Sequence, residues 1–137
     1  MTASKVLIDT NVVSYILKGD SLGMLYAPHL RGVVSAVSFI TVGELYFWAE
    51  ISNWGPERRN DLDARLRGFL VIAFEHEIAR IYGAVMAERR RLGRPISPSD
   101  AWIAASALRH DIPLVTHNAR DFTQISGLTV ITEAVDA

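Results

Sequence analysis

Five short apolar runs along the chain are predicted to form β-strands. They lie at residues 6–8, 33–37, 69–74, 113–116 and 128–131, and the last is expected at an edge of the sheet. The first run, Val6-Leu7-Ile8, is apolar at every position. This pattern is typical of a strand that is buried on both faces of a parallel sheet. The chain is therefore expected to contain a central, mainly parallel sheet of four or five strands.

Between these runs, apolar residues recur at the spacing of helices that cover a core. The pattern is seen at residues 12–16 and 42–49, and again at 75–92, where Ile78, Ile81 and Val85 share one face. Strands that alternate with helices predict right-handed crossovers and a three-layer α/β fold, with a mainly parallel sheet covered on both sides. The chain shows no internal repeat and no linker, so residues 1–137 are predicted to form a single domain.

Composition narrows the class of protein only slightly. The 137 residues are half hydrophobic, which suits one globular domain with a core of its own. A formal charge of −1 gives no overall basic field for nucleic acid, although acids gathered in one pocket can hide a local basic surface. The chain has no cysteine, no signal-peptide pattern and no run near the roughly 18 apolar residues of a spanning helix. We therefore expect a cytoplasmic protein without membrane association.

Acidic side chains follow three of the predicted strands closely. Asp9 comes directly after the first strand, Glu44 follows the second and Asp121 follows the fourth. Thr41 and Glu44 have the Thr-x-x-Glu form of a capping box, so a helix is expected to begin there. Because ligands bind beyond the carboxyl ends of parallel strands, these acids are expected at one functional edge.

A fourth acid, Asp100, lies in the first turn of a predicted helix. Ser97-Pro98-Ser99-Asp100 has the sequence of a helix start, with Ser97 as the cap and Pro98 at the first helical position. Ile103 and the alanines that follow must face the core, which fixes the direction of this first turn. Taken singly, each of the four acids is explained by capping and by the helix dipole. Taken together, they form a candidate site.

Converging carboxylates repel one another, and a bound cation removes that repulsion. Oxygen ligands, with no cysteine and no histidine at metal spacing, favour Mg²⁺ or Mn²⁺ over Zn²⁺. Such an ion polarises a phosphodiester and activates a water molecule, so that no protein nucleophile is required. The acids therefore indicate metal-dependent phosphoryl chemistry.

Four segments of the chain resemble the PIN-domain nucleases. They are Leu7–Asn11 (LIDTN), Ser38–Leu45 (SFITVGEL), Ser99–Ala105 (SDAWIAA) and Leu114–Phe122 (LVTHNARDF). The last segment resembles the VapC-type toxins of bacterial toxin–antitoxin pairs in particular. The resemblance covers residues 5–131 and implies an endoribonuclease that depends on Mg²⁺ or Mn²⁺ and cleaves RNA with a metal-activated water. It also implies a small antitoxin that inserts a segment near the active site, and a homodimer or a hetero-oligomer with the antitoxin.

Carried over by motif, the resemblance makes Asp9, Glu44 and Asp100 the metal-binding acids. Many relatives place a fourth acid, an Asp, two residues after the Thr that ends the fourth strand, and this chain has Asn118 there. Asp121 either substitutes for it as a fourth catalytic acid or only caps its short helix. These two alternatives, and with them the choice between one and two metal ions, stay open.

Other residues near the motifs are candidates for supporting roles. Thr10, Asn11 and Thr116 are expected to position water or the acids. Arg91 belongs to the basic run at residues 89–91, which either contacts RNA phosphates or ends a helix in solvent. The aromatic residues at 46–48 and Trp54 are expected in core or interface packing, where they could receive the antitoxin or a second subunit.

Two other classes of function compete with the nuclease. The first is a phosphatase or receiver-like phosphoryl-transfer domain. The phosphatase would need an acid where Asn11 stands, and the receiver would need an Asp where the third strand ends at Phe74-Glu75. The second is a non-catalytic metal-binding interaction module, in which the acids hold an ion or merely cap helices.

Overall fold

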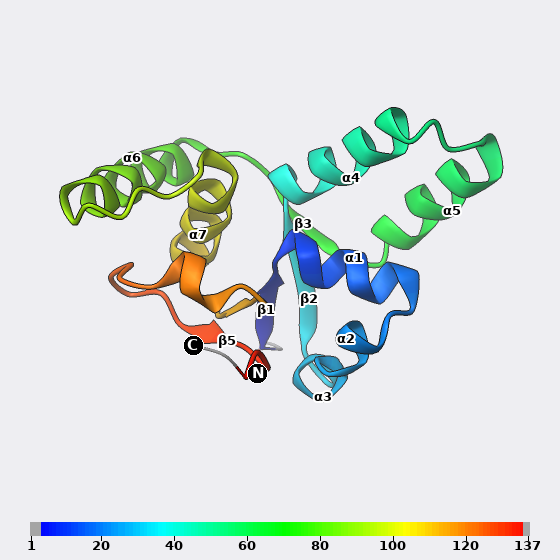
Figure 1. Ribbon diagram of the computed structural model, residues 1–137, viewed down its shortest axis with the longest axis horizontal. Helices are drawn as coiled ribbons and strands as arrows, with labels where there is room; N and C mark the ends of the chain where they lie inside the picture. The colour runs from blue at the N-terminus through cyan, green and yellow to red at the C-terminus, as the bar shows by residue number, and fades with distance from the viewer. Residues whose placement is uncertain (1–3, 136–137) are drawn as a thin grey trace.

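A five-stranded parallel sheet forms the centre of the computed structural model, which describes residues 4–135 (Figure 1). Its strands are β1 (Lys5–Ile8), β2 (Val34–Ser38), β3 (Leu70–Ile72), β4 (Leu114–Val115) and β5 (Val130–Ile131). Their order is β3-β2-β1-β4-β5, and every neighbouring pair is parallel. The five predicted strands and their parallel arrangement are confirmed, with β5 at one edge as expected.

Helices cover both faces of this sheet. They are α1 (Thr10–Lys18), α2 (Ser21–Met24), α3 (Ala27–Leu30), α4 (Phe39–Ile51), α5 (Pro56–Leu66), α6 (His76–Arg91) and α7 (Pro98–His110), with the 3₁₀ helix η1 (Ala119–Phe122). In Figure 1, α6 and α7 lie on one side of the sheet, and α1, α4 and α5 on the other. The three-layer α/β fold predicted from the alternating pattern is confirmed.

Alternating strand residues supply two separate hydrophobic cores, as the two-residue period of a strand requires. In β1, Leu7 packs with Ile78 and Ile103 from α6 and α7. Val6 and Ile8 point to the other face, into the core that α1, α4 and α5 complete. Leu7 and Ile8 are fully buried, as expected for a strand that is apolar at every position. Residues 4–135 contain no helix long and apolar enough to cross a membrane.

Helices begin at the strand ends almost without a loop, and this places the acids. Asp9 separates β1 from α1, and its side chain caps that helix. Ser38 both ends β2 and caps α4, accepting a hydrogen bond from the backbone N–H of Ile40 at 3.1 Å. The predicted capping box at Thr41 and Glu44 is therefore wrong: because the strand-ending serine already caps the helix, α4 begins earlier and both residues lie inside it.

The helix start predicted near Asp100 is confirmed. Ser97 is the cap of α7, and its hydroxyl accepts a hydrogen bond from the backbone N–H of Asp100 at 3.2 Å. Pro98 occupies the first turn, where its missing N–H costs nothing. Asp100 therefore lies in the first turn of the helix, at the carboxyl edge of the sheet.

Candidate active site

A cavity of about 330 Å³ brings the four predicted acids together. Its lining includes Asp9 after β1, Glu44 from α4, Asp100 from α7 and Asp121 from η1. The other lining residues are Thr10, Asn11, Trp48, Ser97, Ser99, Ile103 and Asn118. The sequence argument, in which the ends of parallel strands and the first turn of α7 converge, therefore placed the acids correctly.

Asp9 is the most buried of these acids, with 4% of its surface exposed. One carboxylate oxygen accepts the backbone N–H of Thr10 at 2.8 Å, and the other accepts the hydroxyl of Thr116 at 2.7 Å. Burial, together with the charges of Asp100 and Glu44, raises the pKa of Asp9 to about 6, although these two hydrogen bonds lower it. Asp9 is thus held in one orientation, in surroundings that disfavour its charge.

Asp100 is affected in the same way as Asp9. Its pKa is raised by burial and then by the nearby charges of Asp121 and Glu44. Its hydrogen bond to Ser97 and the positive charge of Arg89 work in the opposite direction. The charge of Glu44 thus acts on both Asp9 and Asp100, and the charge of Asp121 acts on Asp100, so the acids form one negative cluster.

A short chain of hydroxyl groups orients Glu44. The hydroxyl of Thr10 donates to a carboxylate oxygen of Glu44 at 2.8 Å. Thr10 has only one proton to give, so the hydroxyl of Thr41, 2.8 Å away, is the donor in the remaining contact. Both threonines are buried, so this chain is protected from solvent. The sequence analysis gave Thr10 a supporting role but saw Thr41 only as a helix cap.

Both candidates for the fourth acidic position line the cavity. Asn118 is half-buried, and its backbone N–H donates to the hydroxyl of Thr116 at 3.0 Å. Asp121 is exposed on η1, and it is close enough to Asp100 to raise its pKa. Of the two, only Asp121 adds negative charge to the cluster.

The arginines at the end of α6 differ in their exposure to solvent. Arg91 is exposed and does not line the cavity. Arg89 is 4% exposed, and its guanidinium donates to the backbone carbonyls of Arg94, Asp121 and Thr123 at 2.7 to 3.1 Å. The sequence analysis missed this role, although Arg89 shares the buried stripe of α6 with Val85. Arg89 therefore fixes the backbone that carries Asp121.

The donor set of the cavity fits a hydrated Mg²⁺ or Mn²⁺ ion. All the charged groups that line it are carboxylates, and their repulsion adds to the effect of burial in raising the pKa values of Asp9 and Asp100. Among residues 4–135, no three Asp, Glu or His side chains are arranged to hold an ion by themselves. Mg²⁺ is commonly bound by one or two carboxylates while it keeps several water molecules, which suits acids spread around a cavity.

Known proteins resemble this chain over most of its length. The PIN domain family matches residues 6–128. The chain is 31% identical to Ribonuclease VapC2 of Haemophilus influenzae over 124 residues, covering 90% of this chain and 94% of the relative. It is also 31% identical to the tRNA(fMet)-specific endonuclease VapC of Shigella flexneri, with the same coverage.

Solved structures show the same fold. VapBC2 from Rickettsia felis, bound to a DNA fragment from its promoter, matches with a TM-score of 0.82 and 25% identity, covering 93% of this chain and 98% of that one. VapBC-1 from nontypeable Haemophilus influenzae matches with a TM-score of 0.80 and 27% identity, covering 93% and 97%. These matches do not favour a phosphatase, a receiver domain or a non-catalytic module. The chain belongs to the PIN-domain family and, within it, to the VapC-type ribonucleases.

Proposed function

We propose that the protein is a metal-dependent endoribonuclease toxin that hydrolyses RNA phosphodiester bonds at the acidic cavity. The observation that carries the proposal is the convergence of Asp9, Glu44, Asp100 and Asp121 on one cavity at the carboxyl edge of the sheet. Such a cluster would repel an RNA backbone, and a divalent cation both removes that repulsion and attracts phosphate oxygens. The relatives named as ribonucleases support RNA as the substrate.

Asp9, Glu44 and Asp100 would hold a hydrated Mg²⁺ or Mn²⁺ ion, in part through its water molecules, with Asp121 at the open side of the cavity. When bound, such an ion supplies a more acidic water molecule as the nucleophile and neutralises charge on the phosphate. The protein itself holds the carboxylates in fixed orientations. The N–H of Thr10 and the hydroxyl of Thr116 fix the two oxygens of Asp9, and the hydroxyl of Thr10 fixes Glu44. Asn11 and Asn118, which line the cavity with uncharged amides, are placed to contact water or phosphate.

The proposed partner in the cell is a small antitoxin protein. Structural neighbours of this chain are VapBC toxin–antitoxin complexes. A groove of about 460 Å³ between α1, α4 and α5 shares Trp48 with the acidic cavity, and Leu45, Leu62 and Trp54 contribute apolar surface to it. A segment bound there would approach the acids closely enough to block RNA. We further propose a homodimer, alone or in complex with the antitoxin, acting in the cytoplasm.

Cleavage of RNA by the purified protein tests this proposal. We expect Mg²⁺ or Mn²⁺ to support cleavage, a chelator to stop it, and Asp9→Asn or Asp100→Asn to abolish it with the fold intact. Asp111→Asn is the matched control because Asp111 is exposed at the opposite end of α7, with a φ of 52° that asparagine adopts well. Cleavage that survives the chelator, or that both site variants retain, would contradict the proposal.

A further inference from the structure

Tyr26 is a fully buried side chain that no step described so far uses. It lies between α2 and α3, with 0% of its surface exposed, and its ring packs in the core beside Ile8 and Val115. A buried phenol hydroxyl normally finds a hydrogen-bond partner. The partners of this one come from the two segments that follow β4 and β5.

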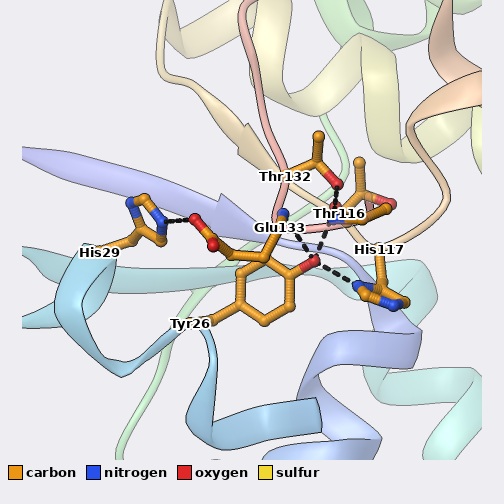
Figure 2. A network of polar contacts seen from close by, with 7 residues as sticks. Tyr26, His29, Thr116, His117, Thr132 and Glu133 are labelled. Atoms are coloured by element: carbon orange, nitrogen blue, oxygen red, sulfur yellow. Dashed lines mark hydrogen bonds and ion pairs between the residues drawn. The ribbon is translucent and has the colours of Figure 1, made fainter. Parts of the chain in front are cut away.

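The Tyr26 hydroxyl has three polar neighbours (Figure 2). The backbone N–H of Glu133 donates to it at 3.1 Å. Nδ1 of His117 is 2.5 Å away, and the carbonyl oxygen of Thr116 is 3.4 Å away. The hydroxyl has a single proton. It donates that proton either to Nδ1 of His117 or to the Thr116 carbonyl, and in the second case Nδ1 of His117 is the donor to the hydroxyl.

The Tyr26 hydroxyl thus holds the His117 ring by a short hydrogen bond, whichever of the two atoms donates. The His117 ring is also packed edge-on against two tyrosines, with ring centroids 5.7 Å from Tyr26 and 6.1 Å from Tyr15. Only Tyr26 bonds to the ring through its hydroxyl among the contacts of the described residues. Tyr26 therefore holds the backbone turn at residues 116–118 through the side chain in its middle.

The same turn orients Asp9. The hydroxyl of Thr116 donates to Asp9 at 2.7 Å and accepts the backbone N–H of Asn118 at 3.0 Å. At its start the turn is paired with β5, because the backbone N–H of Thr116 donates to the carbonyl of Ile131 at 3.0 Å, and the Tyr26 contact holds the next residue, His117. Tyr26 is thus connected to Asp9 in three steps. Its hydroxyl contacts His117, His117 is joined through the backbone to Thr116, and the hydroxyl of Thr116 contacts Asp9.

We propose that Tyr26 is a positioning residue of the active site, acting through the turn at residues 116–118 to orient Asp9 and to present Asn118 to the cavity. The inference rests on the proposed nuclease function. The Tyr26 hydroxyl does not touch the reacting atoms. It affects the rate of cleavage because a displacement of a catalytic group by ~1 Å lowers the rate by up to about 100-fold. Its contribution should appear in turnover rather than in RNA binding.

The test compares Tyr26→Phe with Tyr15→Phe. Both variants keep an aromatic ring against His117, and only Tyr26→Phe removes a hydroxyl that bonds to it. With wild-type circular dichroism spectra for both, we expect Tyr26→Phe to lower kcat by about 10- to 100-fold with KM within about twofold. Tyr15→Phe should retain the wild-type kcat. The ¹⁵N signals of His117 should be alike in the wild type and in Tyr15→Phe, and should change in Tyr26→Phe, which lacks the hydroxyl bonded to Nδ1.

A second pair of variants tests whether Tyr26 acts through Thr116. Thr116→Val removes the hydroxyl that reaches Asp9, so adding Tyr26→Phe to it should lower kcat no further. Multiplying effects in the double variant, or a wild-type kcat in Tyr26→Phe while Asp9→Asn is inactive, would overturn the inference and leave the nuclease proposal standing. A wild-type protein that cleaves no RNA would contradict the nuclease proposal itself, and the inference with it.

Discussion

Replacing Asp9 by asparagine should make the metal-free protein more stable at neutral pH while removing its activity. In the folded protein the pKa of Asp9 is about 6, against 3.8 for an exposed aspartate. One pKa unit corresponds to about 1.4 kcal/mol, so ionised Asp9 destabilises the fold by about 3 kcal/mol. Asparagine has nearly the same shape, can still accept the N–H of Thr10, and carries no charge.

The sign follows from where the proton is bound. Below pH 4 the Asp9 carboxyl is protonated in both the folded and the unfolded chain, so its burial carries no charge penalty. As pH rises from about 4 to about 6, the unfolded chain loses the proton first, and stability falls. Above pH 6 the full penalty is present. The wild type and Asp9→Asn should therefore have similar stability near pH 4 and differ by about 3 kcal/mol at pH 7.5.

Urea unfolding in the presence of a chelator, at several pH values between 4 and 7.5, measures this difference. A gap of ~3 kcal/mol corresponds to roughly 10 °C in Tm for a domain of this size. Mg²⁺ should stabilise the wild type and act weakly on Asp9→Asn. A gap that does not grow with pH, or an asparagine variant that is less stable at pH 7.5, would refute the electrostatic argument. Asp111→Asn should show no such dependence.

Three further changes test other parts of the structure. Gly23→Ala should destabilise the fold by about 1–3 kcal/mol in thermal unfolding, because the new Cβ would lie 2.8 Å from the backbone of Ile16. Gly43→Ala meets nothing within 4 Å on an exposed helical surface and should stabilise by up to ~1 kcal/mol. Arg89→Met leaves three carbonyls without their donor and should lower both the unfolding free energy, by about 2–4 kcal/mol, and RNA cleavage. Asp121→Asn should weaken Mn²⁺ binding in calorimetry if this acid fills the fourth position, and an unchanged affinity would leave that position to the amide of Asn118.

The strands and the meeting of the acids were predictable from sequence because both depend on local patterns. A run such as Val6-Leu7-Ile8 reports burial on two faces, and parallel strands bring their carboxyl ends to one edge. The start of α4 was misplaced because two serine or threonine caps, Ser38 and Thr41, are only three residues apart. Sequence alone does not decide which of them the strand end will use.

The supporting contacts were harder to predict because they join segments that are distant in the chain. Tyr26 bonds to His117 and Glu133, which are 91 and 107 residues away, and no local pattern connects them. Arg89 looked like part of a solvated basic run, and only its place on the buried stripe of α6 distinguished it from Arg91. The acids could be read from the sequence, whereas the groups that hold them required the fold.

The position of β1 in the sheet has a consequence for synthesis on the ribosome. β1 is made first, yet it lies in the middle of the sheet, between β2 and the late strand β4. The hydrogen bond that orients Asp9 comes from Thr116, 107 residues further along the chain. Until the segment after β4 has emerged, a growing chain lacks both that bond and the part of the acidic cavity lined by Asn118 and Asp121. The ribosome that makes this ribonuclease is therefore exposed to a complete active site only after residue 121 has left it.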